Sequence, residues 1–415
     1  MRKPAIVYTS LRRSNAERFE ALIAAQRAGL SVVLMGEAIP EMAKPYAAEC
    51  HICDISDQIA SMEYIRNIAV RYDIFGAISW TDLGLECAAH INENLSLPGL
   101  SVKLLQTLKN KYTTRQTLAH IEGICPKFAL VSNLTELKAA MRTIAYPAIV
   151  KPVGGNGSKG IFTLHNASQL ENAMTELHRL INNGSDAIFK KHGDAFIVEE
   201  FIFGDEVSLE VMIHNHHIDL IGVTDKKTAD PFHFELQHIF PAQLSKNAYA
   251  DITEKIVKII TTLGCNDCTL HIEGKVNNDK FTLIEINARP GGDYITTHLI
   301  PRSTGADHMA NIIKVATGSA PDISAKKTHL YTGVKFLLAQ KQGCFQGLSG
   351  YNDGVFEIGG LDQIMFELPL GAQISLPPKS FTSQRVAAVL AHGSTHQNVG
   401  ETLLAAERTL SIKII

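Results

Sequence analysis

The segment from 269 to 295, TLHIEGKVNNDKFTLIEINARPGGDYI, constrains the fold of this sequence more than any other. Its two strand-like runs, HIEGKV and FTLIEIN, flank a tight Asn-Asn-Asp turn, and this pattern predicts a β-hairpin. Glu285 and Asn287 are two residues apart on the second strand, so they point to the same face, while Glu273 lies on the first strand. Two carboxylates and an amide oxygen are ligands that suit Mg²⁺. The hairpin therefore predicts a magnesium site.

The residues after this hairpin add positive charge and exposed backbone. Arg289 continues the same face and can stabilise phosphoryl or oxyanion charge. Pro290, Gly291 and Gly292 then break the strand and free backbone N–H groups. The alternative is an amphipathic edge hairpin with a solvated polar face. It fits poorly, because the intervening residues are apolar and ionic groups on a buried hairpin are costly without a ligand.

A second motif, YPAIVKPVGGNGSKGIFTL (146–164), joins an apolar strand that ends at Lys151 to the glycine-rich turn GGNGSKG (154–160). Glycine allows positive φ and a close approach of the backbone to a phosphate. Successive N–H groups in such a turn form an anion-binding concavity, to which Lys151 adds a point charge. The pattern is not a P-loop, because GxxxxGK[ST] is absent. A flexible hairpin with a solvent-facing lysine is the alternative.

A third motif, FIVEEFIFGDEVSLEVMI (196–213), reads as a strand, a bend at Gly204 and a second strand. Glu199 and Glu200 end the first strand, and Glu206 opens the second. Backbone groups at such a bend can contact an adenine edge, and a carboxylate a few residues further on can accept from ribose hydroxyls. Solvated charges at strand ends are the alternative.

The order of expected elements predicts an α/β protein. Apolar runs at 5–10, 31–36 and 72–80 alternate with helices, which predicts a small doubly wound parallel sheet without a GxGxxG dinucleotide motif. A polar helical stretch covers 101–120, and a compact lobe of strands and helices runs from 126 to about 204. Strands with a helix at 250–263 follow. From about 330 short strands dominate, with a helix near 398–407 that Gly400 could interrupt.

Composition excludes several partners. The formal net charge of −3 gives no indication of nucleic acid or of an anionic membrane as a partner. The chain shows no signal peptide and no run near the roughly 18 apolar residues of a membrane span, so a soluble cytoplasmic protein is expected. Seven cysteines include two CxxC pairs, Cys50/Cys53 and Cys265/Cys268, which are expected to be reduced thiols. His214, His216 and His217 favour a solvated turn over a metal site.

These motifs, in this order and spacing, resemble those of the ATP-grasp superfamily, in which two lobes clamp Mg-ATP. The resemblance implies an ATP-grasp fold behind the N-terminal doubly wound domain, with segments 1–110, 111–203 (carrying the glycine-rich flap) and 204–415. It implies Mg²⁺ (or Mn²⁺) on Glu273, Glu285 and Asn287. It implies an ATP site formed by Lys111, Lys151, Gly154, Gly155, Gly157, Ser158, Glu199, Glu200, Phe201, Ile202 and Glu206. Arg289 and Lys151 are the implied catalytic residues, and the flap at 154–160 is expected to close over phosphates.

Within that superfamily, the stretch 223–244 and the C-terminal strands resemble the L-amino-acid ligases, the bacilysin-type dipeptide synthetases. The implied reaction is phosphorylation of a carboxylate by ATP, followed by attack of an amine on the acyl phosphate. Substrate contacts are expected from Glu235, His238, Arg289, Gly291 and Gly292. His238 could equally be a packing histidine, and Lys226 and Lys227 could face ATP or solvent. Small-molecule substrates are the expected partners, and the resemblance also allows a homodimer. Two alternatives remain: a carboxylase of the biotin-carboxylase or purine-biosynthesis type, and a non-catalytic nucleotide-binding protein.

Overall fold

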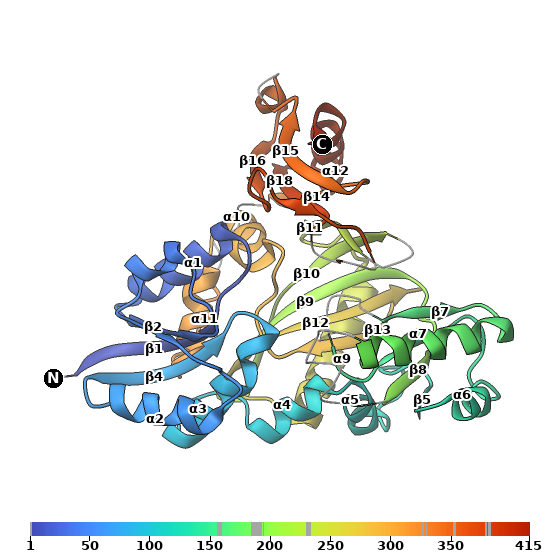
Figure 1. Ribbon diagram of the computed structural model, residues 1–415, viewed down its shortest axis with the longest axis horizontal. Helices are drawn as coiled ribbons and strands as arrows, with labels where there is room; N and C mark the ends of the chain where they lie inside the picture. The colour runs from blue at the N-terminus through green and yellow to red at the C-terminus, as the bar shows by residue number, and fades with distance from the viewer. Residues whose placement is uncertain are drawn as a thin grey trace.

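The computed structural model describes residues 2–155, 160–183, 193, 195–229, 234–324, 328, 330–351, 354–377, 380 and 383–415. The strands in this part of the chain form four sheets. Figure 1 shows the N-terminal sheet in blue, a small lobe in green, the large sheet through the middle, and a C-terminal subdomain that projects above it. The mixed helix and strand composition agrees with the predicted α/β class.

The N-terminal sheet is parallel and has the strand order β3-β2-β1-β4. The order reverses at β1, so the sheet is doubly wound as predicted. Its strands are β1 (Lys3–Ser10), β2 (Ser31–Gly36), β3 (Glu49–Ile52) and β4 (Tyr72–Ser79), and its helices are α1 (Asn15–Arg27), α2 (Gln58–Ile68) and α3 (Leu85–Leu95). Short 3₁₀ turns occupy η1 (Glu41–Tyr46) and η2 (Asp82–Gly84). Ile6 and Tyr8 of β1 are fully buried, because helices cover both faces of a parallel sheet.

The predicted helical stretch at 101–120 is two helices, α4 (Val102–Lys109) and α5 (Lys111–Leu118). The break falls at Asn110, whose side chain accepts from the backbone N–H groups of Tyr112 and Thr113. An asparagine in this position starts a new helix, because its side chain satisfies free N–H groups of the first turn. The break places Lys111 at the N-terminus of α5.

The small lobe has the antiparallel order β5-β8-β6-β7. Its elements are β5 (Phe128–Val131), α6 (Leu134–Ala140), β6 (Ala148–Pro152), β7 (Phe162–Leu164), η3 (Ala167–Gln169), α7 (Leu170–Asn183) and β8 (Phe196–Glu200). The succession of elements is the one that the sequence predicts. Apolar residues of α6 and α7, including Leu137 and Leu177, form one core with the strands.

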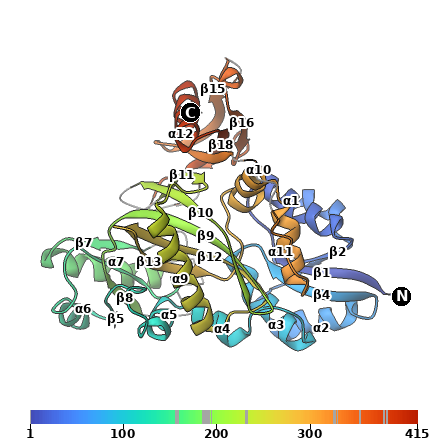
Figure 2. The same cartoon turned by 180° about the vertical axis from the view of Figure 1, so that it is seen from behind.

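The large sheet has eight strands in the order β13-β12-β9-β10-β11-β14-β18-β16. They are β9 (Asp205–His214), β10 (His217–Ala229), β11 (Phe234–Phe240), β12 (Cys268–Asn277), β13 (Lys280–Asn287), β14 (Tyr331–Leu338), β16 (Leu361–Phe366) and β18 (Arg385–Gly393). Helix α9 (Lys246–Leu263) covers one face, as Figure 2 shows, and its Ile252, Ile256 and Ile260 are buried in the core there.

The C-terminal subdomain extends this sheet and adds a three-stranded one. The additional strands are β15 (Gly343–Ser349), β17 (Gln373–Ile374) and β19 (Ser411–Ile414), with a 3₁₀ turn η5 (Val355–Glu357). Helix α12 (His396–Thr409) runs unbroken through Gly400, so the interruption considered from the sequence does not occur. Each sheet draws its strands from one of the predicted segments 1–110, 111–203 and 204–415, but the exact boundaries remain a proposal.

Three helical elements after Arg289 were not expected from the sequence: a π-helical turn η4 (Ile295–Leu299), α10 (Ile300–Thr304) and α11 (His308–Ala316). Helix α11 lies beside α1 in both views (Figures 1 and 2). Its Met309 and Ile312 share a core with the N-terminal sheet, so α11 joins that domain to the large sheet. None of the described helices is long and apolar enough to cross a lipid bilayer.

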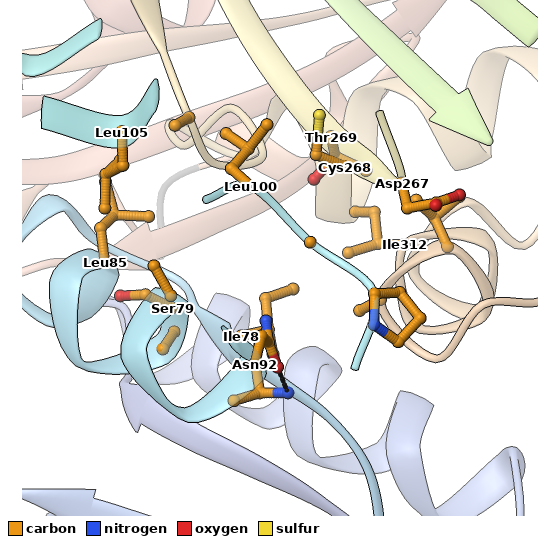
Figure 3. Close-up of a pocket in the computed structure, with 18 of the residues that line it drawn as sticks. Ile78, Ser79, Leu85, Asn92, Leu100, Leu105, Asp267, Cys268, Thr269 and Ile312 are labelled. Atoms are coloured by element: carbon orange, nitrogen blue, oxygen red, sulfur yellow. Dashed lines mark hydrogen bonds between the residues drawn. The ribbon is translucent and has the colours of Figure 1, made fainter. Parts of the chain in front are cut away.

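A cavity of about 70 Å³ remains between the N-terminal domain and β12. Figure 3 shows Leu85, Leu100, Leu105 and Ile312 around it, and Asn92 hydrogen-bonded to the backbone of a neighbouring strand. Most of its lining is apolar and it holds no residue of the predicted site. We regard it as a packing gap between two domains.

Candidate active site

Two adjoining cavities lie where the small lobe, the large sheet and the N-terminal domain meet. The first, of about 160 Å³, lies between β6–β8 and the hairpin β12–β13, and the second, of about 430 Å³, extends from there toward the N-terminal domain. Four charged residues, Lys226, Glu235, Glu273 and Glu285, line both. The two cavities are therefore adjacent and share an ionic boundary.

The first cavity brings together most residues predicted to bind ATP. They are Lys111, Lys151, Gly154, Gly155, Glu199, Glu200, Phe201, Ile202 and Glu206. Ile149, Ile161 and Ile284 supply apolar walls that the sequence analysis did not single out, and they give a flat aromatic ring a surface to pack against. The predicted residues Gly157 and Ser158 lie outside the described part of the chain, as does most of the predicted flap.

Glu199 is held by two cations inside the protein. Its Oε2 lies 2.6 Å from Lys151 Nζ and its Oε1 lies 2.6 Å from Arg115 Nε. Burial alone would raise the pKa of Glu199, but Arg115 and Lys151 lower it to about 2. Arg115 also donates to the carbonyl of Ile284 on β13 (2.7 Å), so one buried guanidinium links α5, the small lobe and the large sheet. The sequence analysis missed Arg115, four residues after Lys111.

Lys111 connects the glycine-rich turn to the predicted metal strand. Its Nζ donates to the carbonyl of Gly155 (2.9 Å) and lies 3.0 Å from Glu285 Oε2. Its backbone N–H also bonds Val153 (2.7 Å), which fixes the start of α5 against β6. One ammonium therefore faces both the turn and the carboxylate.

The hairpin β12–β13 forms in the predicted place. Asn278 and Asp279 turn it with positive φ values of 48° and 63°, as two-residue hairpin turns require. Glu273 pairs with Glu285 and His271 pairs with Asn287 across the two strands, so the four side chains project from one face.

No cluster of three or more carboxylate, histidine or cysteine groups forms a preformed metal cage among the described residues. The donor set of Glu273, Glu285 and Asn287 nevertheless fits Mg²⁺, which takes one or two carboxylates and completes its shell with phosphates and water. The pKa of Glu273 is held well below its usual range, against the effect of burial, by Lys226 and His271. A carboxylate kept ionised in this way can serve as a ligand.

Lys226 is buried and lines both cavities, whereas Lys227 is exposed. The sequence had left open which of these two lysines faces the site and which faces solvent. The Nζ of Lys226 lies 2.8 Å from Glu273, 3.1 Å from Glu206 and 3.9 Å from Glu235. Adjacent residues of a strand point to opposite faces, so only one of the two lysines can reach the cavity.

His271 and Glu210 form a second buried pair that the sequence analysis missed. His271 Nδ1 lies 2.5 Å from Glu210 Oε1, and its Nε2 lies 3.3 Å from Glu273 Oε1. Burial would lower the pKa of His271, but Glu210 and Glu273 raise it to about 9. Glu210 also accepts from the N–H of Gly291 (3.0 Å). The sequence could have identified His271, because it precedes Glu273 by two residues and therefore lies on the same face of the strand.

The second cavity lies at the carboxyl ends of β1 and β4, where the strand order of the N-terminal sheet reverses. Open α/β sheets bind ligands at such a switch point. Arg12, after β1, donates to the carbonyls of Pro290 (2.7 Å) and Gly291 (2.6 Å), and Asp82, after β4, lies 3.1 Å from Arg289 Nε. The N-terminal domain therefore orients the arginine predicted to be catalytic.

The far wall of this cavity comes from the C-terminal subdomain. Arg385 on β18 contacts Asp293 (2.6 Å) and Glu367 (2.8 Å), and its guanidinium lies 3.6 Å from the centre of the Phe336 ring. Burial would raise the pKa of Asp293, but Arg385 and His238 hold it well below its usual range. Apart from His238, none of these residues was singled out in the sequence.

The residues predicted to contact substrate also lie here. Glu235, His238, Arg289 and Gly292 line the second cavity, whereas Gly291 lies behind it against Glu210. His238 is buried, and neither ring nitrogen has a hydrogen-bond partner in the described part of the chain, although Nε2 lies 3.4 Å from Asp293. A buried imidazole whose Nδ1 has no hydrogen-bond partner among the described residues is available to a polar ligand.

Two other sequence features lie away from the site. His214, His216 and His217 lie at the β9–β10 turn, where His214 faces Asp267 (3.2 Å), which supports the solvated turn. All seven cysteines are free thiols.

Comparison with protein families now identifies the class. A model of the ATP-grasp N-terminal domain matches residues 19–99, a model of the ATP-grasp domain matches residues 144–298, and together they match more than half of the chain. The chain belongs to the ATP-grasp family.

The individual proteins that this chain resembles are distant from it in sequence. The solved structure of an L-amino acid ligase from Bacillus licheniformis shares the fold over the full length of both chains, with a TM-score of 0.83 and 20% identity. The chain is 28% identical to alanine–anticapsin ligase of Bacillus subtilis over 55% of this chain and 52% of that protein. It is 24% identical to carnosine synthase 1 of Homo sapiens over 67% of this chain and 35% of that protein. The chain thus spans about a third to a half of the length of these two curated relatives.

Proposed function

We propose that this chain is an ATP-dependent ligase that joins an amino acid, or another small carboxylic acid, to the amine of an amino acid. The observation that carries this proposal is the boundary that the two cavities share, formed by Lys226, Glu235, Glu273 and Glu285. A phosphoryl group held in the first cavity would meet a carboxylate held in the second at this boundary. The names of relatives that are amino-acid ligases support the substrate class.

Nucleotide binding would use the first cavity. We assign the phosphates to Lys111, Lys151 and the backbone of Gly154 and Gly155, as a glycine turn and two ammonium groups allow. The adenine would lie along the backbone of residues 200–202, between the isoleucine walls, and its ribose near Glu206. Mg²⁺, or Mn²⁺ in its place, would be held by Glu273, Glu285 and Asn287 and would neutralise phosphate charge when bound.

The chemistry would run in two balanced steps. A carboxylate oxygen of the first substrate attacks the γ-phosphorus, the bond to the bridging oxygen breaks and ADP leaves. The amine nitrogen of the second substrate then attacks the acyl carbon, loses a proton, and phosphate leaves with the electrons of the broken C–O bond. Arg289, oriented by Asp82, would stabilise charge on the transferred phosphoryl group and on the tetrahedral oxyanion. Most of the catalysis would come from positioning and charge stabilisation.

A phosphate-release screen over pairs of amino acids and small carboxylic acids tests the proposal. We expect phosphate release that requires ATP, Mg²⁺ and both substrates, with the amide product detected by mass spectrometry. Bicarbonate-dependent ADP release without amino acids would instead indicate a carboxylase. Nucleotide binding without turnover in any pair would indicate a non-catalytic protein. Homodimerisation and a cytoplasmic location remain predictions.

A further inference from the structure

The two carboxylates proposed for the metal are already engaged by donors of the same chain. Glu273 Oε2 lies 2.8 Å from Lys226 Nζ, and its Oε1 lies 3.3 Å from His271 Nε2. Glu285 Oε2 lies 3.0 Å from Lys111 Nζ, and its Oε1 accepts from Asn287 Nδ2 (3.1 Å). All four carboxylate oxygens therefore have an internal partner.

Lys226, the partner of Glu273, is a buried residue. The side chain of Lys226 is 3% exposed, and its ammonium is shared among Glu273, Glu206 and Glu235. A dication placed between Glu273 and Glu285 would have to displace this ammonium or lie within a few ångströms of it. Like charges at such separations repel strongly where water is largely excluded.

Lys111 carries a second connection. The same ammonium that contacts Glu285 donates to the carbonyl of Gly155 in the glycine-rich turn. A polyphosphate bound in the first cavity beside Gly154 and Gly155 would attract both Lys111 and Lys226, because both lysines line this cavity. Movement of either ammonium toward phosphate oxygens would release a carboxylate oxygen.

We propose that Lys226 and Lys111 act as internal counter-ions of the metal carboxylates, so that a divalent metal binds weakly alone and strongly only with nucleotide polyphosphate. This inference rests on the proposed function, because it assumes the nucleotide and metal assignments. Binding of the two ligands is then coupled, and by thermodynamic linkage each must raise the affinity for the other by the same factor. Without nucleotide, the two ammonium groups pair with the carboxylates and disfavour metal binding. A bound polyphosphate attracts the ammonium groups and frees carboxylate oxygens for the metal.

The counter-ion proposal is tested by measuring the affinity of the full chain for Mn²⁺. Free Mn²⁺ is measured by electron paramagnetic resonance, once without nucleotide and once with a non-hydrolysable ATP analogue. We expect Lys226→Met to bind Mn²⁺ alone about tenfold more tightly than the wild type, a typical coupling factor. Lys111→Met should act in the same direction through Glu285. Lys227→Met is the matched control, because this neighbouring lysine is exposed and lies on the other face of β10, and its Mn²⁺ affinity should equal that of the wild type.

The two variants keep the test decisive if one of them does not fold. Mn²⁺ affinity without nucleotide that is unchanged or weaker in the folded lysine variants would overturn the counter-ion proposal while leaving the proposed function intact. A wild type that binds Mn²⁺ no better with the ATP analogue than without it would also overturn it. If the wild type bound neither the analogue nor Mn²⁺ under any condition, the proposed function would fail as well.

Discussion

Glu273 on β12 lies directly opposite Glu285 on β13, as a cross-strand pair of the same hairpin. Two like charges in this relationship are destabilising unless cations share the face. Lys226 and Lys111 supply those cations from two other segments of the chain. The pair therefore has an electrostatic cost, and the proposed metal site would explain why it is present.

Replacement of Glu285 by alanine tests the metal assignment. We expect Glu285→Ala to lower ATP turnover by about 100-fold or more, because one fixed charge at the reacting phosphates is lost. Glu254→Ala is the control, since Glu254 is an exposed residue of α9 whose partner is the neighbouring Lys258. Phosphate release measured for both variants decides the matter, and unchanged turnover in Glu285→Ala would show that the assignment is wrong.

Arg115 should matter more for stability than its position in a polar helix suggests. Arg115→Met leaves Glu199 buried with Lys151 as its remaining ion-pair partner among those described here. We expect a loss of about 3 kcal/mol or more in the free energy of unfolding, measured by urea denaturation. Lys127→Met removes the partner of Glu200 at a lysine that is 70% exposed, and it should cost under about 1 kcal/mol. Equal effects of the two substitutions would contradict this ranking.

Because His308 is buried, we expect the folded protein to lose stability in mild acid. Burial at the start of α11 lowers the pKa of His308 from 6.5 to about 4. Its folded pKa is below the unfolded value, so its contribution is fully present above pH 6.5 and is lost as the pH falls toward 4. The effect is at most about 3 kcal/mol.

The pH dependence is measured by urea denaturation between pH 7.5 and 4.5. His308→Gln should flatten the dependence relative to the wild type, whereas His120→Gln, at an exposed histidine, should not. Parallel curves for the wild type and His308→Gln would refute the assignment.

Gly291 should tolerate no side chain. A Cβ at this position would overlap Glu210 Oε1 and crowd the ring of His271. We expect Gly291→Ala to destabilise the protein by about 1–3 kcal/mol and to raise the KM for the carboxylate or amine substrate, because the turn beside Arg289 shifts. Gly359→Ala, where a Cβ meets no atom within 4 Å, serves as the control. Normal kinetics in Gly291→Ala would show that the turn does not position substrate.

Local patterns were sufficient for the parts of the site that lie on one hairpin or one turn. The period of two in FTLIEIN places Glu285 and Asn287 on one face. The Asn-Asn-Asp turn pairs the two strands as far as Gly274 and Leu283, whereas a register shift between Glu273 and Gly274 brings Glu273 opposite Glu285. The doubly wound N-terminal sheet followed equally from alternating apolar runs. These features depend on neighbours in the sequence, and periodicity records such neighbours directly.

Long-range packing decided the rest. The sequence could not tell whether Lys226 or Lys227 faces the cavity, because that depends on which face of β10 the rest of the protein covers. It gave no sign that Arg115 would meet Glu199, 84 residues away, or that Asp82 would meet Arg289, 207 residues away. A charged side chain carries no mark of its partner until the fold excludes water around both. The sequence by itself therefore indicated the family to which this chain belongs, and the tertiary structure decided how the charges of its candidate site are balanced.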